Sequence, residues 1–374
     1  MLTRILVAAL ASIVAVNAAP SAIRGGGVLS PPSPSFEAFA VHYNKQYATS
    51  AERLRRQRIY EDNVRDIARL NALPEGTAVF EVNGFADLTP AEFEATYMMA
   101  NADVTGNLHA RAATHPAAAN NNSSAPAAVP AEKNWFLKAT TPRRAQGQCG
   151  SCWAFSAVEQ VESDWFLAGK AGAKPEALSV QQVVDCDTAE AYGCSGEYAG
   201  GGSGFDYVMK NGGLASEAAY PYVSGTTGEA GKCKQNITIA GGRITGHKYV
   251  VKPCDMPWDD CNDQDEDAVA AYVGSKGPLA ICVNAKNWQF YKKGVATASL
   301  CGGHDHASLD HCVQLVGYSG YDAGKGAKGS GAKGAYWIVR NSWRAPWGIG
   351  GLIYLSMGNN TCGMADVPSY TVVG

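Results

Sequence analysis

The stretch at residues 146–156, which reads QGQCGSCWAFS, constrains this chain most, because a glycine-containing loop here runs directly into a helical pattern. From residue 153 to residue 167 apolar side chains recur at helical spacing, and Gly169 follows as a stop signal. The pattern places Cys152 in the first turn of the predicted helix. A thiol there lies near the positive end of the helix dipole and near free amide donors, which favours its thiolate. The sequence therefore predicts a nucleophilic cysteine.

Cys149 and Cys152 also form a Cys-x-x-Cys pair, which occurs in thioredoxin-like redox proteins and in zinc sites. A zinc site would need a second ligand pair at matching spacing, and the sequence offers none. A redox pair would be expected in a compact βαβ unit, whereas this chain is much longer and rich in cysteine. We therefore favour the nucleophile over both alternatives, and we predict no metal site and no cofactor.

Three segments of the chain resemble the papain-like cysteine peptidases. CGSCW at 149–153 resembles their active-site segment. LDHCVQLVGY at 309–318 resembles their histidine strand, and YWIVRNSW at 336–343, continued by Trp347 and Gly348, resembles their asparagine segment. The order Cys, His, Asn is also the order of the family.

The resemblance implies a catalytic set of Cys152, His311, Asn341 and Gln146. The thiolate of Cys152 would attack the peptide carbonyl, and His311 would pair with it and protonate the leaving amine. Asn341 would orient the imidazole, while the Gln146 side chain and the backbone N–H of Cys152 would form the oxyanion hole. Because all four residues are present, a non-catalytic peptide-binding homologue on the same fold is the weaker alternative.

The fold implied is α+β, with a helical left lobe at about 140–240 and a β-barrel-like right lobe at about 241–370, and an active-site cleft between them. From about residue 244 onward, short apolar runs separated by glycine predict strands at 278–283, 312–318, 336–339 and 352–355, with a surface loop at 324–334. The expected domains are a signal peptide (1–18), an inhibitory propeptide (19–100), a linker with the activation site (101–129) and the mature peptidase (130–374).

The propeptide assignment depends on a helical pattern and on its resemblance to the cathepsin L-like branch. Between residues 36 and 71 polar and aromatic side chains recur every three or four residues, with Arg56, Tyr60 and Asn63 near one stripe. This stripe and the segment at 83–93 resemble the two prodomain motifs of that branch, although Tyr60 replaces the usual phenylalanine. The resemblance implies a helical propeptide that inhibits its own protease.

The N-terminus and the cysteine content point to the secretory pathway. Arg4 precedes an apolar run at 5–16 that is too short to span a membrane, and eleven cysteines suit an oxidising compartment. We expect a final location in a lysosome-like or vacuole-like compartment or outside the cell. Candidate glycosylation sites follow the Asn-x-Ser/Thr pattern at Asn121, Asn122, Asn236 and Asn359, the first two within the linker.

By family position, three disulfides are implied: Cys149–Cys194, Cys186–Cys233 and Cys301–Cys362. Cys254 and Cys261 lie in a segment additional to the short form of the family, and we expect them to bridge to each other. Cys282 and Cys312 remain. They fall on neighbouring positions of the substrate pocket, either as buried free thiols, which we favour, or as a disulfide across the pocket wall.

Specificity is expected from the pocket that receives the second residue before the scissile bond. By family position Val367 forms its floor and Leu309, Cys282 and Cys312 its walls, which favours an apolar or aromatic side chain. Further substrate contacts are expected from Gly196, Asp310 and Trp343. Glu197 replaces a glycine that the family pattern leads us to expect. Separately, the long loop at 302–308 lies near His311, where it could cap one end of the cleft, so an exopeptidase stays an alternative.

The net charge of −3 indicates no particular partner. We expect protein or peptide substrates, the chain's own propeptide as inhibitor, no nucleic acid, no membrane span and a monomer.

Overall fold

The computed structural model of the chain describes residues 34–73, 75–99, 129–188, 191–197, 202–254, 261, 264–301, 303, 308–344 and 346–374. The predicted signal peptide, nearly all of the linker with Asn121 and Asn122, and most of the 302–308 loop lie outside the described residues. No helix within the described part is both long enough and apolar enough to cross a membrane.

The N-terminal segment consists of three helices and a short strand. They are α1 (Phe36–His42), α2 (Ser50–Asn71), β1 (Val79–Phe80) and α3 (Pro90–Tyr97). Thr89 and Glu92 form a reciprocal capping box at the start of α3, next to a proline that suits the first helical position. The Asn63 amide of the predicted stripe turns inward, since its Nδ2 donates to Ala86 O and Leu88 O, each at 2.8 Å. The stripe therefore folds the segment onto itself.

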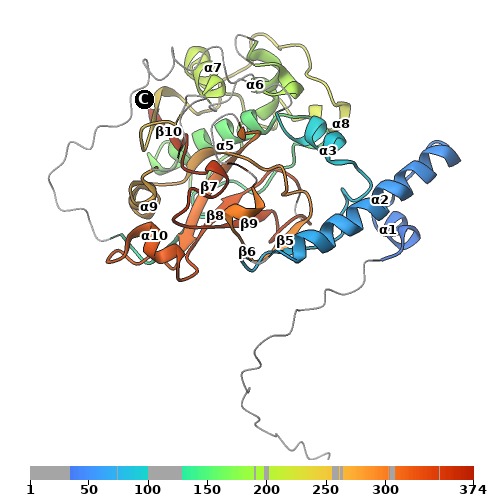
Figure 1. Cartoon of the computed structure of the whole chain (residues 1–374). Helices are drawn as coiled ribbons and strands as arrows, with labels where there is room; N and C mark the ends of the chain where they lie inside the picture. Colours follow the sequence, from blue (N-terminus) through green and yellow to red (C-terminus); the bar gives the residue numbers. More distant parts are fainter. Residues whose placement is uncertain are drawn as a thin grey trace, which may run out of the picture. The chain divides into compact units, whose positions relative to one another are not determined.

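A second group of helices surrounds α5 (Cys152–Leu167), which ends before Gly169 with its φ of +71°. Its members are α6 (Val180–Cys186), η1 (Gly193–Ser195), α7 (Ser203–Asn211) and α8 (Ser224–Thr227). α5 packs against α6 and α7 on one side and against β7 on the other, as Figure 1 shows. Because α5 has neighbours on both sides, every side chain from residue 152 to residue 164 is buried.

The sheet has eight strands in the order β3-β10-β4-β7-β8-β9-β6, with β2 also paired to β7. The strands are β2 (Glu132–Asn134), β3 (Ile244–Tyr249), β4 (Leu279–Val283), β6 (Val295–Ala296), β7 (His311–Ser319), β8 (Tyr336–Arg340), β9 (Leu352–Ser356) and β10 (Ser369–Val373). β5 (Tyr291–Lys293) pairs instead with β1 of the N-terminal segment. Among the described strands the two ends of the path, β3 and β6, do not pair, so the sheet is not a closed barrel.

Short helices complete this part of the chain: α9 (Glu266–Ser275), η2 (Ala298–Leu300), α10 (Gly326–Gly331) and η4 (Thr361–Gly363). The loop predicted at 324–334 therefore contains one helix, α10. Asp267 on α9 stabilises it by accepting hydrogen bonds from the Ala327 backbone N–H and the Tyr321 hydroxyl, each at 2.7 Å. The glycine-rich sequence of this segment did not predict a helix, because the contacts that stabilise α10 come from Asp267 on another helix.

Buried ion pairs join α5 to the sheet and to the segment before it. Arg340 of β8 lies 2.9 Å from Glu159, and Arg144 lies 2.8 Å from Glu162. The second carboxylate also accepts a hydrogen bond from Thr141 Oγ1 at 2.6 Å. Arg340, Glu159 and Glu162 are almost wholly excluded from solvent and Arg144 is partly buried, and buried charges need such partners. The network fixes α5 against β7 and β8, which carry the predicted histidine and precede the predicted asparagine.

Five disulfides cross-link the described residues after position 148: Cys149–Cys194, Cys186–Cys233, Cys254–Cys261, Cys282–Cys312 and Cys301–Cys362. Three are the pairs that the resemblance implied, and Cys254–Cys261 is the pair expected in the additional segment. The expectation of free thiols at Cys282 and Cys312 is wrong, because the antiparallel register of β4 and β7 places these two residues directly opposite each other. Cys152 is the one cysteine left free.

Candidate active site

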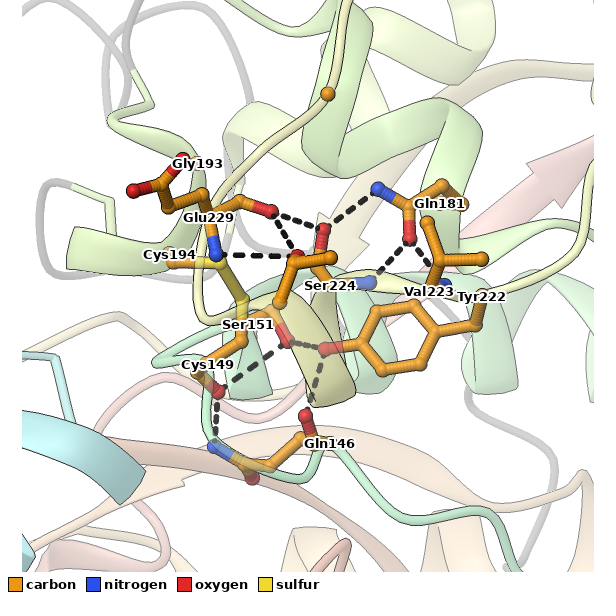
Figure 2. The surroundings of a disulfide bond; sticks show 12 residues. Gln146, Cys149, Ser151, Gln181, Gly193, Cys194, Tyr222, Val223, Ser224 and Glu229 are labelled. Carbon is orange, nitrogen blue, oxygen red and sulfur yellow. Dashed lines mark hydrogen bonds between the residues drawn. A yellow bond between two sulfur atoms is a disulfide. The ribbon is translucent and has the colours of Figure 1, made fainter.

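Cys152 begins α5, and the loop before it is held in place by several contacts (Figure 2). The Cys149–Cys194 disulfide attaches this loop to η1. The Tyr222 hydroxyl lies 2.7 Å from Ser151 Oγ and donates to the Gln146 carbonyl at 2.8 Å. The position of Cys152 therefore depends on a cross-linked, hydrogen-bonded loop.

The predicted histidine and asparagine meet at the start of β7 and just after β8. Antiparallel pairing of these strands brings His311 Nε2 to within 2.8 Å of Asn341 Oδ1. The same oxygen accepts a hydrogen bond from the Ser342 backbone N–H at 2.7 Å, which fixes the orientation of the amide. Because an amide oxygen only accepts, Nε2 carries the proton, and Nδ1 is the basic nitrogen of a neutral imidazole.

Trp343 covers this hydrogen bond. Its ring stacks on the His311 imidazole with ring centroids 4.5 Å apart and planes 27° from parallel. His311 Nδ1 is buried and has no hydrogen-bond partner among the described residues. The basic nitrogen is thus left available for a reacting group, while the other nitrogen is fixed.

The sulfur of Cys152 lies beside β7, where the backbone N–H of Cys312 acts to lower the pKa of the thiol. Burial raises the pKa of the Cys152 thiol to about 12, and the nearby carboxylates of Glu197 and Asp310 add to the rise. Burial also lowers the pKa of His311 to about 4, although its hydrogen bond to Asn341 works in the opposite direction. The thiolate expected at the helix N-terminus is therefore not favoured in this form, because desolvation outweighs the amide donors.

Residues 97–99 of the N-terminal segment explain this desolvation. Gln146 Nε2 donates to the Tyr97 carbonyl at 3.0 Å, and the Met99 backbone N–H donates to the Asp310 carbonyl at 2.8 Å. Gly196, with a φ of +103°, lies so close to Met99 that a Cβ there would fall 2.9 Å from Met99 Cβ. The side-chain amide predicted for the oxyanion hole is thus already bound to a peptide carbonyl.

Met99 also belongs to the buried apolar cluster that contains the predicted pocket. The cluster includes Cys152, Cys282, Leu309, Cys312 and Val367. Glu197, which departs from the family pattern, is 1% exposed and forms a β-bridge with Ala191. The structure therefore places the predicted pocket residues together, around a side chain of the N-terminal segment.

Sequence reasoning missed two contributors to the site. Ser342 Oγ donates to Gln146 Oε1 at 2.6 Å, which turns the Nε2 group of that amide toward Tyr97. The sequence signal that could have identified Ser342 is its place between the predicted Asn341 and Trp343. No comparable pattern identified Tyr97 and Met99, because the hydrogen bonds that they make to the site come from their backbone groups, which any residue type carries.

The N-terminal segment is held against the sheet by matched contacts outside the site. Asn83 Nδ2 donates to the Gln289 carbonyl at 2.7 Å, and Gln289 Nε2 donates back to the Phe85 carbonyl at 3.0 Å. Phe93 packs edge-on against Trp343, with centroids 4.9 Å apart. The same tryptophan therefore contacts both the imidazole and the covering segment.

Within the part of the chain that the structure describes, one group of side chains has metal-ligand spacing, namely Cys254, Cys261 and Asp366. The two cysteines are joined in a disulfide and cannot act as thiolate ligands. Of the candidate glycosylation sites, Asn236 and Asn359 both lie exposed on the surface.

Comparison with known proteins assigns both parts of the chain. The model of the papain family cysteine protease matches residues 129–372, and the model of the cathepsin propeptide inhibitor domain (I29) matches residues 36–93. A cysteine proteinase of Trypanosoma brucei brucei is 37% identical over 345 residues, which cover 91% of this chain and 67% of that protein. Cysteine proteinase 1 of Dictyostelium discoideum is 35% identical over 354 residues, covering 90% and 92%.

Among solved structures, the digestive procathepsin L2 proteinase from the larval midgut of Tenebrio molitor is similar, with a TM-score of 0.72 and 29% sequence identity. The match covers 90% of this chain and 98% of that one. The predicted papain-like fold with a helical propeptide is thereby confirmed. The chain belongs to the papain family of cysteine proteases, in its cathepsin L-like branch, and carries the inhibitory propeptide of a zymogen.

Proposed function

We propose that this protease is an endopeptidase in which Cys152 is the nucleophile, His311 the general base and acid, Asn341 the orienting group and Gln146 an oxyanion donor. The observation that carries the proposal is the binding of residues 97–99. An internal stretch of chain places a carbonyl on Gln146 Nε2 and an amide on the Asp310 carbonyl. Residues 97–99 are followed and preceded by further chain, so the site binds an internal stretch of polypeptide. Such a site suits cleavage within a polypeptide.

The residues support a specific sequence of steps. His311 Nδ1 takes the proton of Cys152, and the thiolate attacks the substrate carbonyl carbon. The electrons of the carbonyl bond move to its oxygen, where Gln146 Nε2 and the Cys152 backbone N–H stabilise the charge. Nδ1 then protonates the leaving amine as the C–N bond breaks, and water, activated by His311, hydrolyses the thioester.

The propeptide suppresses this chemistry in two ways. It binds the oxyanion donor, and it buries the catalytic pair, so that the pKa of Cys152 is raised and the pKa of His311 is lowered. Both shifts favour the neutral pair. Removal of residues 97–99 would rehydrate the site and favour the thiolate and imidazolium. We place the activating cleavage in the 101–129 linker.

The predicted preference for an apolar or aromatic second residue is supported by Met99, which lies in the same apolar cluster as Val367 and Leu309. We expect Val367→Glu to raise acceptance of a basic side chain at that position by about tenfold, because a carboxylate would line the pocket. Val367→Gln is the matched control, since it has nearly the same shape without the charge. An equal gain with glutamine, or no gain with glutamate, would show that Val367 does not form the floor.

We further infer a route through the secretory pathway to a lysosome-like or vacuole-like compartment or to the outside. Five disulfides in the protease part support this route, because they persist in oxidising compartments. Exposed sequons at Asn236 and Asn359 are compatible with it.

The decisive experiment is a cleavage map. The full chain is processed under acidic, reducing conditions and mixed with a diverse peptide pool, whose products are identified by mass spectrometry beside a Cys152→Ala control. We expect cuts within the peptides at bonds where the second residue before the cut has a bulky apolar side chain. All of these cuts should be absent in the control. Stepwise trimming from one end would contradict the endopeptidase, and cutting by the control would contradict the nucleophile.

A further inference from the structure

The Cys282–Cys312 disulfide lies in the wall of the predicted pocket. The two cysteines are directly opposite in the β4–β7 pair, and their Cα atoms are 4.0 Å apart. Antiparallel neighbours of the non-hydrogen-bonded type are ordinarily about 4.5 Å apart. The bond therefore holds the two strands closely together at this point.

The direction of the side chains places the disulfide on the catalytic side of the sheet. Along β4, residues Leu279, Ile281 and Val283 join the larger core, whereas Ala280 and Cys282 join the cluster around Cys152. This alternation is the ordinary period of two in a strand. Leu309 and Val367, which are also predicted to line the pocket, belong to that same cluster, so the disulfide lies on the side of the sheet where the pocket is expected.

Cys312 also connects the pocket to the catalytic residues. It follows His311 directly in β7, and it belongs to the same buried cluster as Cys152. One register step along, His311 faces Val283. A shift of β4 relative to β7 at the disulfide would thus change the pocket wall beside the reacting groups.

We propose that the Cys282–Cys312 disulfide is a specificity-determining element, which narrows the pocket for the second residue before the scissile bond, so that opening it favours larger side chains there. The inference depends on the proposed function, since it takes that pocket as the substrate site. With the bond intact, the closely spaced strands limit the pocket. With the bond broken, β4 and β7 relax to ordinary spacing and the wall moves outward.

The opening reaction is a two-electron reduction. With a phosphine and water, the Cys282–Cys312 S–S bond breaks and two S–H bonds form, while the phosphine is oxidised to its oxide. With a small thiol, two thiol molecules supply the electrons and protons and leave as their disulfide. The same reductants keep Cys152 active. A protease handled in strong reductant would therefore have a reduced Cys152 and an open Cys282–Cys312 bond at the same time.

The test compares two peptides that differ only at the second residue, one with leucine and one with phenylalanine. The measured quantity is the ratio of kcat/KM for phenylalanine to kcat/KM for leucine. Because both values come from one preparation, the fraction of enzyme with an active Cys152 cancels. The ratio is measured on processed enzyme across a phosphine series, with the state of Cys282 read by alkylation and mass spectrometry, and on Cys282→Ala/Cys312→Ala. Cys186→Ala/Cys233→Ala removes a disulfide outside this cluster as the matched control.

We expect the ratio to rise roughly tenfold as Cys282 becomes alkylatable and in the Cys282→Ala/Cys312→Ala variant, a change typical of a pocket that gains about one methylene of space. The control variant should stay within about twofold of the wild type. If that alanine variant does not fold, the phosphine series alone decides. A ratio that does not move while the bond opens overturns the inference and leaves the pocket assignment standing. An intact enzyme that cuts without regard to the second residue overturns the pocket and this inference together.

Discussion

The propeptide and the protease domain are stabilised by different kinds of interaction. All eleven cysteines lie at position 149 or later, and five disulfides cross-link the protease domain. The propeptide has none, and ion pairs join its helices instead. Arg56 binds Glu52 at 2.6 Å and Glu92 at 2.7 Å, and Lys45 binds Asp87 at 2.7 Å.

This difference shows how one part can be released while the other stays folded. Partial burial works to raise the pKa of Glu92, but the Thr89 backbone N–H and the guanidinium groups of Arg55 and Arg56 outweigh it and lower the pKa to about 2. A lowered pKa means that the carboxylate stabilises the folded propeptide above about pH 4.3, the value expected for an unfolded chain. This contribution is lost as the pH falls from there toward 2, whereas the disulfides are unaffected.

The largest effect is expected from His311→Ala in the processed enzyme. Removing the base and acid should lower kcat/KM on the order of 10⁵-fold, because the nucleophile and its base act as a unit. The variant is measured beside Cys152→Ala, and the two losses should be similar. A His311→Ala enzyme that keeps more than about a tenth of its activity would contradict the assignment.

Gln146→Ala should have the next largest effect, because it removes a donor that contacts both the transition state and the propeptide. We expect kcat to fall about 10² to 10³-fold with little change in KM. Gln148→Ala is the matched control, since Gln148 lies two residues away with an exposed side chain. Equal losses in the two variants would show that the loop, and not the amide, matters.

Arg56→Ala should weaken the propeptide and leave the protease domain intact. The variant loses the ion pairs to Glu52 and Glu92 and a hydrogen bond to the Asp87 carbonyl, so inhibition by the propeptide should weaken about tenfold. Autoprocessing of the full chain should then begin at a higher pH. Arg65→Ala breaks an exposed pair with Asp62 and serves as control. If autoprocessing of Arg56→Ala begins at the same pH as in the wild type, or if Arg65→Ala shifts that pH equally, the ion pairs of Arg56 do not hold the propeptide in place.

A smaller effect is expected inside the protease domain, at Asp164. Burial raises the pKa of this carboxyl to about 6, although hydrogen bonds from Thr371 and Gln160 oppose the rise. A raised pKa makes the folded state bind more protons than the unfolded one between about pH 4 and 6. Stability should therefore fall by up to about 3 kcal/mol as the pH rises through that window.

Asp164→Asn should flatten this pH dependence, which urea unfolding of the full-length Cys152→Ala chain can follow. Asp322→Asn is the control, because the Asp322 side chain is 46% exposed and bonds to its near neighbours Gly324 and Lys325. A slope that survives in Asp164→Asn would show that another group carries it.

Much of this architecture could be predicted from the sequence. The helix at Cys152, the strands at β4, β7, β8 and β9 and the approach of His311 to Asn341 follow from periodicity and from matched motifs. The bond between Cys282 and Cys312 could not be predicted, because only the strand register shows which residues are opposite. The neutral state of the catalytic pair was also beyond prediction, since it follows from burial, and Tyr97 and Met99 bind the site through backbone hydrogen bonds that their residue types do not reveal.

The most direct test of the central claim measures how fast iodoacetamide alkylates Cys152 in the full chain and in the processed enzyme at near-neutral pH, with mass spectrometry identifying the labelled cysteine. The thiolate is the reacting species, and the propeptide both covers the sulfur and favours the thiol. The account predicts that processing raises the rate by at least about a hundredfold, because release both uncovers the sulfur and lowers the pKa of the thiol, and each pKa unit changes the thiolate fraction about tenfold. Equal rates before and after processing would contradict it, because the propeptide would then neither cover the nucleophile nor keep it neutral.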